Sequence, residues 1–433
     1  MHRELAVLRA VPGVVAVAQV SQMPLSRSGS TSSVAINQAQ GTETTSASQY
    51  LSGDSLIKTF GLTLVEGRDF IAIDNERTAG RLHRLGERIR GGENRGWSVV
   101  TAMSSLAYYS FERELMRVVG ARLAAGEFDL VHRITPLSPT SQSLIAASAS
   151  KLNIPFVIGP LNGGTPWLPA FDAVRRQEKE WLSPWRGLYR LMPAYRATRK
   201  HAAVIIAGSM ATRSELPQEA RMKSVLLPEN GIDPDRFPFT RRRNDQGALR
   251  IAFVGRLVPY KGADILLEAV AAIGGAANIE VMIIGDGPAR TWFEGRLPTG
   301  AVFTGFQRGE DLGRAIASAD ILLNPSVTET FGNVTLEAMS CGLPVVAARA
   351  TGSLSLVEDK ITGRLIRPGA HEQFAQALRV YCEDPGARAV AGAAGREVSE
   401  RFSWDAVNGA LADGYLRIIR HRKAGYRPIN RPR

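Results

Sequence analysis

Cysteine is scarce in this sequence of 433 residues, which contains only Cys341 and Cys382. Two cysteines are too few for a disulfide framework, and such scarcity is typical of proteins from a reducing compartment. No histidine lies near Cys341 in the sequence, so we interpret it as a small buried residue rather than a nucleophile. No apolar run reaches the roughly 18 residues that a membrane-spanning helix needs. We therefore expect a cytoplasmic protein without disulfides or membrane-spanning helices.

The sequence also lacks the motifs that accompany nucleic acids and most cofactors. It contains no zinc knuckle, helix-turn-helix or aromatic RNA-binding signature, no cluster of metal ligands and no Walker motif. Gly285-Asp286-Gly287 lacks the third glycine of a dinucleotide fingerprint. The formal net charge is nevertheless +12, which we attribute to an anionic substrate and to an anionic membrane surface. No nucleic acid, metal ion or cofactor is expected.

The clearest positive signal is a strand, a loop and a helix in the last third of the chain. Residues 321–323 are apolar and predict a buried strand, which Pro325 and Ser326 end. Gly332 permits a tight turn, and residues 334–340 predict a helix. Such a passage directs unpaired helix N–H groups towards a ligand above the carboxyl edge of a sheet, which favours an anion.

Two glutamates flank the start of this helix. Glu329 lies in the loop, and Glu337 lies one helical turn after Asn333. A carboxylate can accept hydrogen bonds from two neighbouring hydroxyls, such as those of a ribose or a hexose. Two glutamates at this spacing are also common on solvated surfaces, so the pair alone does not define a site.

A second loop supplies positive charge. Residues 249–254 predict a strand and residues 263–272 an apolar helix, and the loop between them begins at Gly255 and ends at Gly262. This loop contains Arg256 and Lys261, two cations that can hold a diphosphate.

Together these residues resemble the donor half of the family 4 glycosyltransferases, which have the GT-B fold of two Rossmann-like domains facing a cleft. The resemblance covers about residues 81–420, and the motifs occur in the family's order. Its residues are Phe253-Val254-Gly255-Arg256, Lys261-Gly262, Ile284-Gly285-Asp286-Gly287-Pro288, Gly305-Phe306, Ala319-Asp320, Pro325-Ser326, Glu329, Glu337 and Ala338-Met339-Ser340-Cys341-Gly342-Leu343-Pro344-Val345-Val346.

The resemblance implies a role for each motif residue. It assigns Arg256 and Lys261 to the diphosphate of a nucleotide-sugar donor, Glu329 to the transferred sugar and Glu337 to the ribose. The remaining donor-binding residues are Gly255, Gly285, Gly287, Phe306, Gly332 and Asn333. It also implies transfer with retention of the anomeric configuration and without a metal ion.

The acceptor side is less complete in its motifs. Residues 128–132 and 155–158 predict two strands of a parallel sheet. His132 matches a family histidine at the first strand end, although a capped structural histidine fits equally well. A second family histidine is replaced here by the loop 159–164, whose Asn162 and Gly163 are our acceptor-side candidates.

Residues 1–80 do not follow the transferase pattern. They resemble a fragment of the periplasmic core domain of macrolide-exporter-type ABC permeases, through residues 8–14, 23–26, 60–64, 67–70 and 74–75. No membrane helix or ATPase motif accompanies this fragment, so permease activity does not follow. A gene fusion or a gene-call artefact explains it.

Residues 171–200 interleave Trp181, Trp185, Tyr189 and Tyr195 with arginine and lysine. Basic and aromatic residues together suit a membrane interface or a lipid-linked acceptor. An ordinary pair of helices packed on the sheet explains the same pattern.

We thus predict an α/β GT-B protein whose N-terminal Rossmann-like domain is incomplete. The predicted parts are residues 1–80, the permease-like fragment with an α+β fold; 81–228, the acceptor-side domain; 229–400, the donor-binding domain; 401–420, a crossing helix; and 421–433, a basic tail. The predicted function is retaining transfer of a sugar from a nucleoside-diphosphate sugar to a glycan, a polysaccharide precursor or a lipid-linked acceptor. The alternative is a nucleotide-sugar-binding protein whose turnover is impaired because the first strand and helix of the acceptor-side domain are missing from the pattern. The predicted location is cytoplasmic, with peripheral contact at the inner face of the membrane left open.

Overall fold

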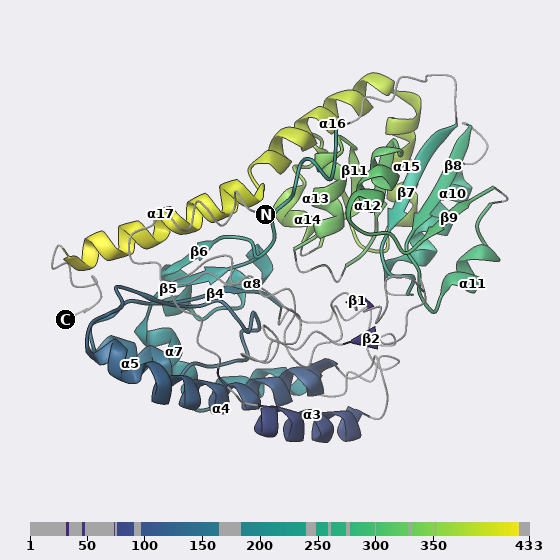
Figure 1. Cartoon of the computed structure of the whole chain (residues 1–433). Coiled ribbons are helices and arrows are strands. Elements are labelled where there is room, and N and C mark those ends of the chain that lie inside the picture. Colours follow the sequence, from purple (N-terminus) through teal and green to yellow (C-terminus); the bar gives the residue numbers. More distant parts are fainter. Residues whose placement is uncertain are drawn as a thin grey trace, which may run out of the picture. The chain divides into compact units, whose positions relative to one another are not determined.

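The computed structural model in Figure 1 describes residues 76–90, 97–163, 183–239, 248–258, 261–273, 278–298, 300–327, 331–350 and 352–423, with Ile73, Glu329 and the paired strands β1 (Ser32–Ser33) and β2 (Ser46–Ala47). The chain divides into two compact units. Unit 1 comprises residues 1–207, 215–225 and 411–433, and unit 2 comprises residues 208–214 and 226–410. Each unit is built around its own sheet.

Unit 1 contains a four-stranded sheet in the order β3 (Val131–Arg133), β4 (Phe156–Leu161), β5 (Ala202–Ala207) and β6 (Ser224–Leu226). Strands β3, β4 and β5 pair in parallel, so their carboxyl ends share one edge. The strand residues Phe156 and Ile205 are buried against Leu123 and Ile145 from the helices. The apolar strand segments of the sequence therefore form the core of this unit.

The following helices belong to unit 1. They are α3 (Glu76–Arg90), α4 (Trp97–Ala124), α5 (Ile145–Lys151), the 3-10 helix η2 (Ser183–Leu191), α7 (Tyr195–His201) and α9 (Gln218–Met222). Figure 1 shows α3 running alongside α4. Gly86 lies at this contact, because an added Cβ atom would be 3.1 Å from Cγ of Met103.

Unit 2 contains a six-stranded sheet in which all neighbouring strands are parallel. Its order is β12 (Gly363–Ile366), β11 (Val345–Ala348), β10 (Ile321–Asn324), β7 (Leu249–Val254), β8 (Ile279–Ile284) and β9 (Val302–Gly305). The central strand β10 is buried along its whole length. This burial explains why residues 321–323 are continuously apolar rather than alternating.

The following helices belong to unit 2. They are α8 (Met210–Ser214), α10 (Ala263–Ile273), α11 (Arg290–Glu294), α12 (Gly309–Ala317), α13 (Asn333–Ser340), α14 (Ser353–Leu356), α15 (His371–Glu383) and α16 (Pro385–Glu400). Helix α17 (Trp404–Lys423) begins in unit 2 and belongs to unit 1 from Leu411 onwards. Alternating strands and helices with two parallel sheets confirm the predicted α/β fold class.

Some predicted elements differ from the observed ones. The predicted start of the acceptor-side part, residue 81, lies inside α3, which begins at Glu76. Helix α17 continues to Lys423, beyond the predicted end at residue 420, and Arg422 in its last turn donates to the carbonyl oxygen of Asp129 at 3.0 Å. Its basic last turn also suits the negative end of the helix dipole.

Other predictions lie outside the described residues. Apart from the short strands β1 and β2, these include nearly all of the permease-like residues 1–80, and also the polar segment 241–247. The predicted domain bounds therefore stay predictions. Among the helices that the structure describes, none has the length and apolarity needed to cross a membrane.

Candidate functional site

The carboxyl edge of the unit 2 sheet is built from glycine loops in close backbone contact. Gly255 follows β7 and Gly285 follows β8, with φ angles of 145° and 143°. A Cβ atom on Gly285 would lie 2.0 Å from the carbonyl oxygen of Gly255, and one on Gly287 would lie 2.5 Å from that of Leu257. Because only glycine allows this approach, the three predicted site glycines hold these two loops together.

Lys261 and Glu329 form an ion pair at the same edge, with Nζ of the lysine donating to Oε1 of the glutamate. Their side chains are 22 % and 18 % exposed. A Cβ atom on Gly262 would lie 2.8 Å from Cβ of Pro325, so the two loops that carry the pair are packed together. Partial exclusion of water makes this attraction stronger than that of a surface pair.

Helix α13 begins beside this pair. Its N-cap is Gly332, with φ of 97° and no side-chain cap. The next residue, Asn333, accepts a hydrogen bond through Oδ1 from Nδ2 of Asn230 at 2.9 Å. Because no side chain caps the helix, its first N–H groups are available to an anion, as the sequence pattern predicts.

Glu337 lies one turn inside α13 and is partly buried. Burial, and secondly the charge of Glu329, raise the pKa of its carboxyl from 4.5 to about 7. This carboxyl therefore changes its ionisation near neutral pH. Its ability to accept hydrogen bonds from a diol increases as it ionises.

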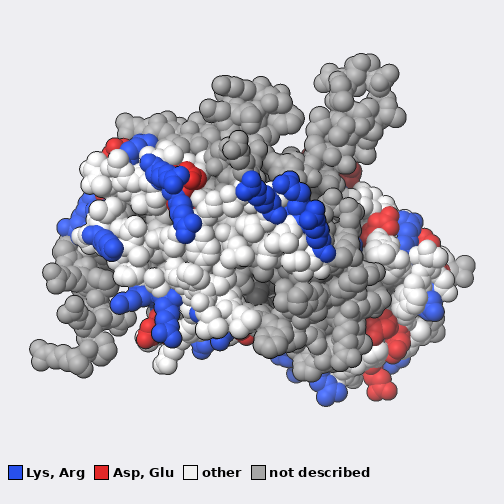
Figure 2. Space-filling view, turned by 90° about the horizontal axis from the view of Figure 1, so that it is seen from below, with Lys and Arg blue, Asp and Glu red and all other residues white. Residues whose placement is uncertain are grey.

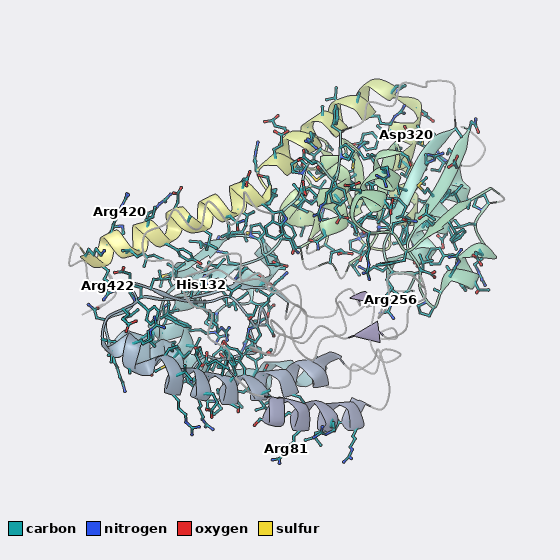
Figure 3. The ribbon with its side chains drawn as sticks, in the orientation of Figure 1. Arg81, His132, Arg256, Asp320, Arg420 and Arg422 are labelled. Atoms are coloured by element: carbon teal, nitrogen blue, oxygen red, sulfur yellow. The ribbon has the colours of Figure 1, made fainter. Side chains whose placement is uncertain are left out.

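Arg256 and Phe306 lie on the outer part of this edge. Arg256 is exposed and projects from the loop after β7 (Figure 3). Phe306 follows β9, is 64 % exposed, and has Cζ of Arg308 4.7 Å from its ring centre. An exposed aromatic ring next to a cation can stack on a base.

Three buried serines were not predicted from the sequence. Ser326 follows β10, and Ser353 and Ser355 belong to α14; the hydroxyl groups of all three are buried without a hydrogen-bond partner. Their loops meet, because the Gly352 N–H donates to the carbonyl oxygen of Glu329 at 2.9 Å. Small polar residues are too frequent in loops to stand out, which is why the sequence gives no signal for them.

In unit 1, both ring nitrogens of His132 have partners within the unit. Nε2 lies 2.8 Å from the carbonyl oxygen of Gly159, and Nδ1 contacts the hydroxyl of Tyr415. Since a carbonyl only accepts, Nε2 carries the proton and Nδ1 accepts from Tyr415. Burial lowers the pKa of His132 to about 4, so its ring is neutral at physiological pH.

The other acceptor-side candidates follow β4. The N–H of Asn162 donates to the carbonyl oxygen of Leu137 at 2.8 Å, and its Oδ1 accepts from the Gly163 N–H at 2.8 Å. Gly163 has φ of 87°, and its Cα faces open space. His132, Asn162 and Gly163 thus lie at the carboxyl ends of neighbouring strands.

The basic and aromatic pattern of residues 171–200 is divided between core and surface. Tyr195 and Arg199 are buried, at 8 % and 9 % exposure, whereas Leu191 is 81 % exposed. Trp181 lies outside the described residues, and nothing is described of the Trp185 side chain. In the part of the chain that the structure describes, no three His, Cys, Asp or Glu side chains gather in an arrangement able to hold a metal ion.

Comparison with known proteins finds a family match within unit 2. Residues 248–384 match the family described as Glycosyl transferases group 1. The chain is 36 % identical over 219 residues to a D-inositol 3-phosphate glycosyltransferase of Saccharomonospora viridis, covering 46 % of this chain and 51 % of that protein. It is 36 % identical over 197 residues to the sulfoquinovosyl transferase SQD2 of Arabidopsis thaliana, covering 42 % and 38 %. The chain thus spans about half or less of the curated relatives it matches.

Solved structures resemble more of the chain. Alr3699/HepE of Anabaena, crystallised with UDP, superposes with a TM-score of 0.53 at 22 % identity, over 70 % of this chain and 82 % of that one. The sucrose-phosphate synthase of Thermosynechococcus elongatus gives a TM-score of 0.51 at 20 % identity, over 72 % and 79 %. At this identity the likeness concerns the fold. The chain has the two-domain GT-B fold, and its residues 248–384 match the model of the group 1 glycosyl transferases.

Proposed function

We propose that this protein is a retaining glycosyltransferase that moves a sugar from a nucleoside-diphosphate sugar to a glycan, a polysaccharide precursor or a lipid-linked acceptor. The observation that carries this proposal is the Lys261–Glu329 ion pair next to the uncapped start of α13. It combines a cation and free helix N–H groups with a carboxylate. Anion and hydroxyl groups can therefore be bound side by side, as a sugar diphosphate requires.

In the proposed complex, the diphosphate lies between Arg256, Lys261 and the start of α13. Negative charge grows on the diphosphate as its bond to the sugar breaks, so these groups stabilise the transition state more than the bound donor. Lys261 then exchanges Glu329 for phosphate oxygens. Glu329 is released to accept hydrogen bonds from the sugar, and Glu337 accepts them from the ribose.

Because Lys261, Arg256 and the helix supply positive charge, we propose that transfer needs no metal ion. Activity should then survive treatment with EDTA. That Alr3699/HepE was crystallised with UDP and with UDP-glucose supports a nucleoside diphosphate as the donor class. We further propose a cytoplasmic location with peripheral contact at an anionic membrane, which the net charge of +12 supports.

The test begins with isothermal titration of the full chain with UDP, ADP and GDP, without an acceptor. One of them should bind at micromolar Kd, and Lys261→Ala should weaken binding at least about tenfold, since a charge-assisted contact is lost. Arg314→Ala is the matched control, because Arg314 is exposed on α12. Absence of binding to all three nucleotides overturns the proposal.

A second candidate is a nucleotide-sugar-binding protein with impaired turnover. Residues 1–80 resemble a permease fragment, and the first unit of the acceptor domain is missing from the sequence pattern. Nucleotide binding without hydrolysis or transfer of the labelled sugar, over a panel of extracted glycan and lipid acceptors, would favour this candidate. Replacing residues 1–80 with an acceptor-domain opening unit should then raise transfer without changing donor Kd.

A further inference from the structure

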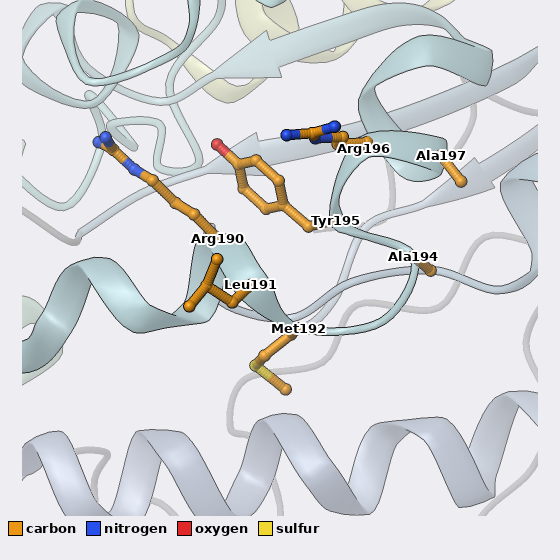
Figure 4. Close-up of a pocket in the computed structure, with 7 residues that line it drawn as sticks. All are labelled: Arg190, Leu191, Met192, Ala194, Tyr195, Arg196 and Ala197. Atoms are coloured by element: carbon orange, nitrogen blue, oxygen red, sulfur yellow. The ribbon is translucent and has the colours of Figure 1, made fainter.

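Unit 1 contains a pocket that the proposed donor site does not use (Figure 4). Its volume is about 350 Å³, and it lies where η2 ends and α7 begins. It is lined by Arg190, Leu191, Met192, Ala194, Tyr195, Arg196 and Ala197. The lining therefore combines two guanidinium groups and one phenol with apolar side chains, and includes no carboxylate.

The two arginines are available to a ligand. Both are exposed at the surface of the unit. Arg190 lies 3.8 Å from Glu215, and these side chains are 50 % and 32 % exposed. An ion pair so open to water contributes little and is readily exchanged for another anion. In the view of Figure 4, the guanidinium groups of Arg190 and Arg196 lie to the left and right of the Tyr195 hydroxyl.

Tyr195 supplies a polar group that lacks a partner. The residue is 8 % exposed, and its buried hydroxyl has no hydrogen bond. Its ring is held in place by the guanidinium of Arg199, 3.7 Å from the ring centre, and by the edge of Tyr189 at 5.6 Å. A buried hydroxyl without a partner is unfavourable, so an acceptor oxygen entering the pocket would satisfy it.

Apolar side chains adjoin these polar groups. Leu191 is 81 % exposed, more than any other large apolar side chain in the described residues, and Leu188 is 52 % exposed. Met192 also lines the pocket. A ligand that used the whole lining would therefore carry an anionic group and an apolar chain next to each other.

The pocket is fixed near the loops that hold the acceptor-side candidates. Helix α7 leads into β5, and a helix that connects parallel strands starts at their carboxyl edge. The hydroxyl of Tyr109 donates to the carbonyl oxygen of Pro193 at 2.6 Å, and Nη2 of Arg199 donates to that of Pro139 at 3.0 Å. Pro139 belongs to the loop that follows β3.

We propose that this pocket binds the phosphate group of a lipid, with Arg190, Arg196 and the Tyr195 hydroxyl on the phosphate oxygens and Leu188 and Leu191 against the first carbons of the chain. The identity of the bound lipid rests on the proposed function, because a glycosyltransferase would bind a phospholipid-like acceptor or a membrane lipid here. The binding itself is independent of sugar transfer and of the donor site.

The experiment titrates the full chain with dihexanoyl phosphatidic acid below its micellar concentration, and in parallel with inorganic phosphate. The parent should bind the lipid saturably, and more tightly than phosphate. The double variant Arg190→Gln/Arg196→Gln should weaken lipid binding at least about tenfold, because charge-assisted contacts are lost. Leu191→Ser should weaken binding of the lipid but not of phosphate, which separates a lipid site from a site for free phosphate.

Figure 2 shows lysine and arginine spread over one face of the molecule, so a general effect of charge has to be separated from the pocket. The matched control is Arg113→Gln/Arg117→Gln, which removes two exposed arginines from α4 of the same unit. Equal loss of binding in both double variants overturns the proposal, as does equal affinity of the parent for lipid and phosphate. Tyr195→Phe should weaken lipid binding without lowering stability, because its hydroxyl has no partner to lose.

Failure of this proposal and of the proposed function are distinguishable. Binding of a nucleoside diphosphate without binding of the lipid supports the proposed function and overturns the lipid-pocket proposal. Binding of the lipid at the pocket without binding of any nucleotide supports the lipid-pocket proposal and overturns the proposed function.

Discussion

The two units use charged side chains in opposite ways. In unit 1 a buried set of charges, Glu112, Arg133 and Arg199, holds one loop, residues 134–144. Glu112 is fully buried and accepts hydrogen bonds from the Ser143 hydroxyl at 2.6 Å and from the Leu144 N–H. Arg133 donates to the carbonyl oxygen of Ser141 at 2.9 Å, and Arg199 donates to Oε1 of Gln142 at 2.6 Å.

In unit 2 the charges at the sheet edge remain partly accessible. Lys261 and Glu329 are about one-fifth exposed, and Arg256 is exposed. The backbone there is held instead by glycine loops, which need no charge to stay in contact. The difference indicates that the buried charges of unit 1 serve its structure, whereas the sheet edge of unit 2 keeps its charges for a ligand. Variants of the buried charges of unit 1 should therefore alter stability, and variants at the sheet edge of unit 2 should alter donor binding.

The largest effect is expected from Glu112→Ala. The change leaves the start of α5 uncapped and removes the carboxylate beside the buried Arg133. Loss of one member of such a buried network costs about 3–5 kcal/mol. Urea denaturation followed by circular dichroism should show this loss, while the chain that remains folded keeps the Kd of the parent for nucleotide.

Glu114→Ala is the control for this variant, because Glu114 lies on α4 and pairs only with the exposed Arg117 in the described residues. Its unfolding free energy should differ little from that of the parent. If both glutamate variants have the stability of the parent, the charges of unit 1 are not structural and the comparison fails.

The next largest effects are expected from variants of the two cations of unit 2, Arg256 and Lys261. Arg256→Ala and Lys261→Ala should each raise the barrier to sugar transfer by about 2–4 kcal/mol, because each removes a positive side chain that stabilises the leaving diphosphate. Only Lys261→Ala should also lower stability, since it leaves the partly buried Glu329 without its ion pair. Single-turnover rates and urea denaturation of the two variants measure both effects. Turnover like that of the parent in both variants would show that the loop is structural.

The sequence predicted the sheet edge of unit 2 but not the buried charges of unit 1. Unit 2 was predictable because its glycines and apolar strands are dictated by close contacts that only those residue types allow, as at Gly285 and β10. The buried network of unit 1 was not predictable. Glu112 and Arg133 are 21 positions apart, and nothing in their local pattern distinguishes them from surface charges. Their pairing with one loop depends on packing that periodicity does not encode.

A smaller effect is expected from Glu337→Gln. The carboxyl should contact the ribose in the bound donor and in the transition state alike, so the donor KM should rise about tenfold with little change in kcat. Steady-state kinetics at saturating acceptor separates the two constants. A normal KM with a much lower kcat would contradict the assignment to the ribose.

The pH dependence sharpens this assignment. The pKa of Glu337 is raised from 4.5 to about 7 in the folded chain. Stability from its protonated form is therefore present below pH 4.5 and is lost as the pH rises through about 7. Nucleotide affinity should change in the opposite sense, rising between about pH 6 and 8 as the carboxylate forms. Glu337→Gln should show neither trend, whereas Lys261→Ala should keep both.

The smallest effect tests whether His132 belongs to the structure of unit 1 or to its chemistry. Tyr415→Phe removes the hydroxyl that donates to Nδ1 of His132 but leaves the contact of Nε2 with Gly159. If His132 is structural, Tyr415→Phe should lower the free energy of unfolding by about 1 kcal/mol and leave kcat and its pH profile unchanged. His132 is neutral above its pKa of about 4, so freeing Nδ1 creates a base only if an acceptor hydroxyl can reach it. A change in the pH profile of kcat would therefore assign His132 to the acceptor and show that this buried group of unit 1 takes part in the chemistry.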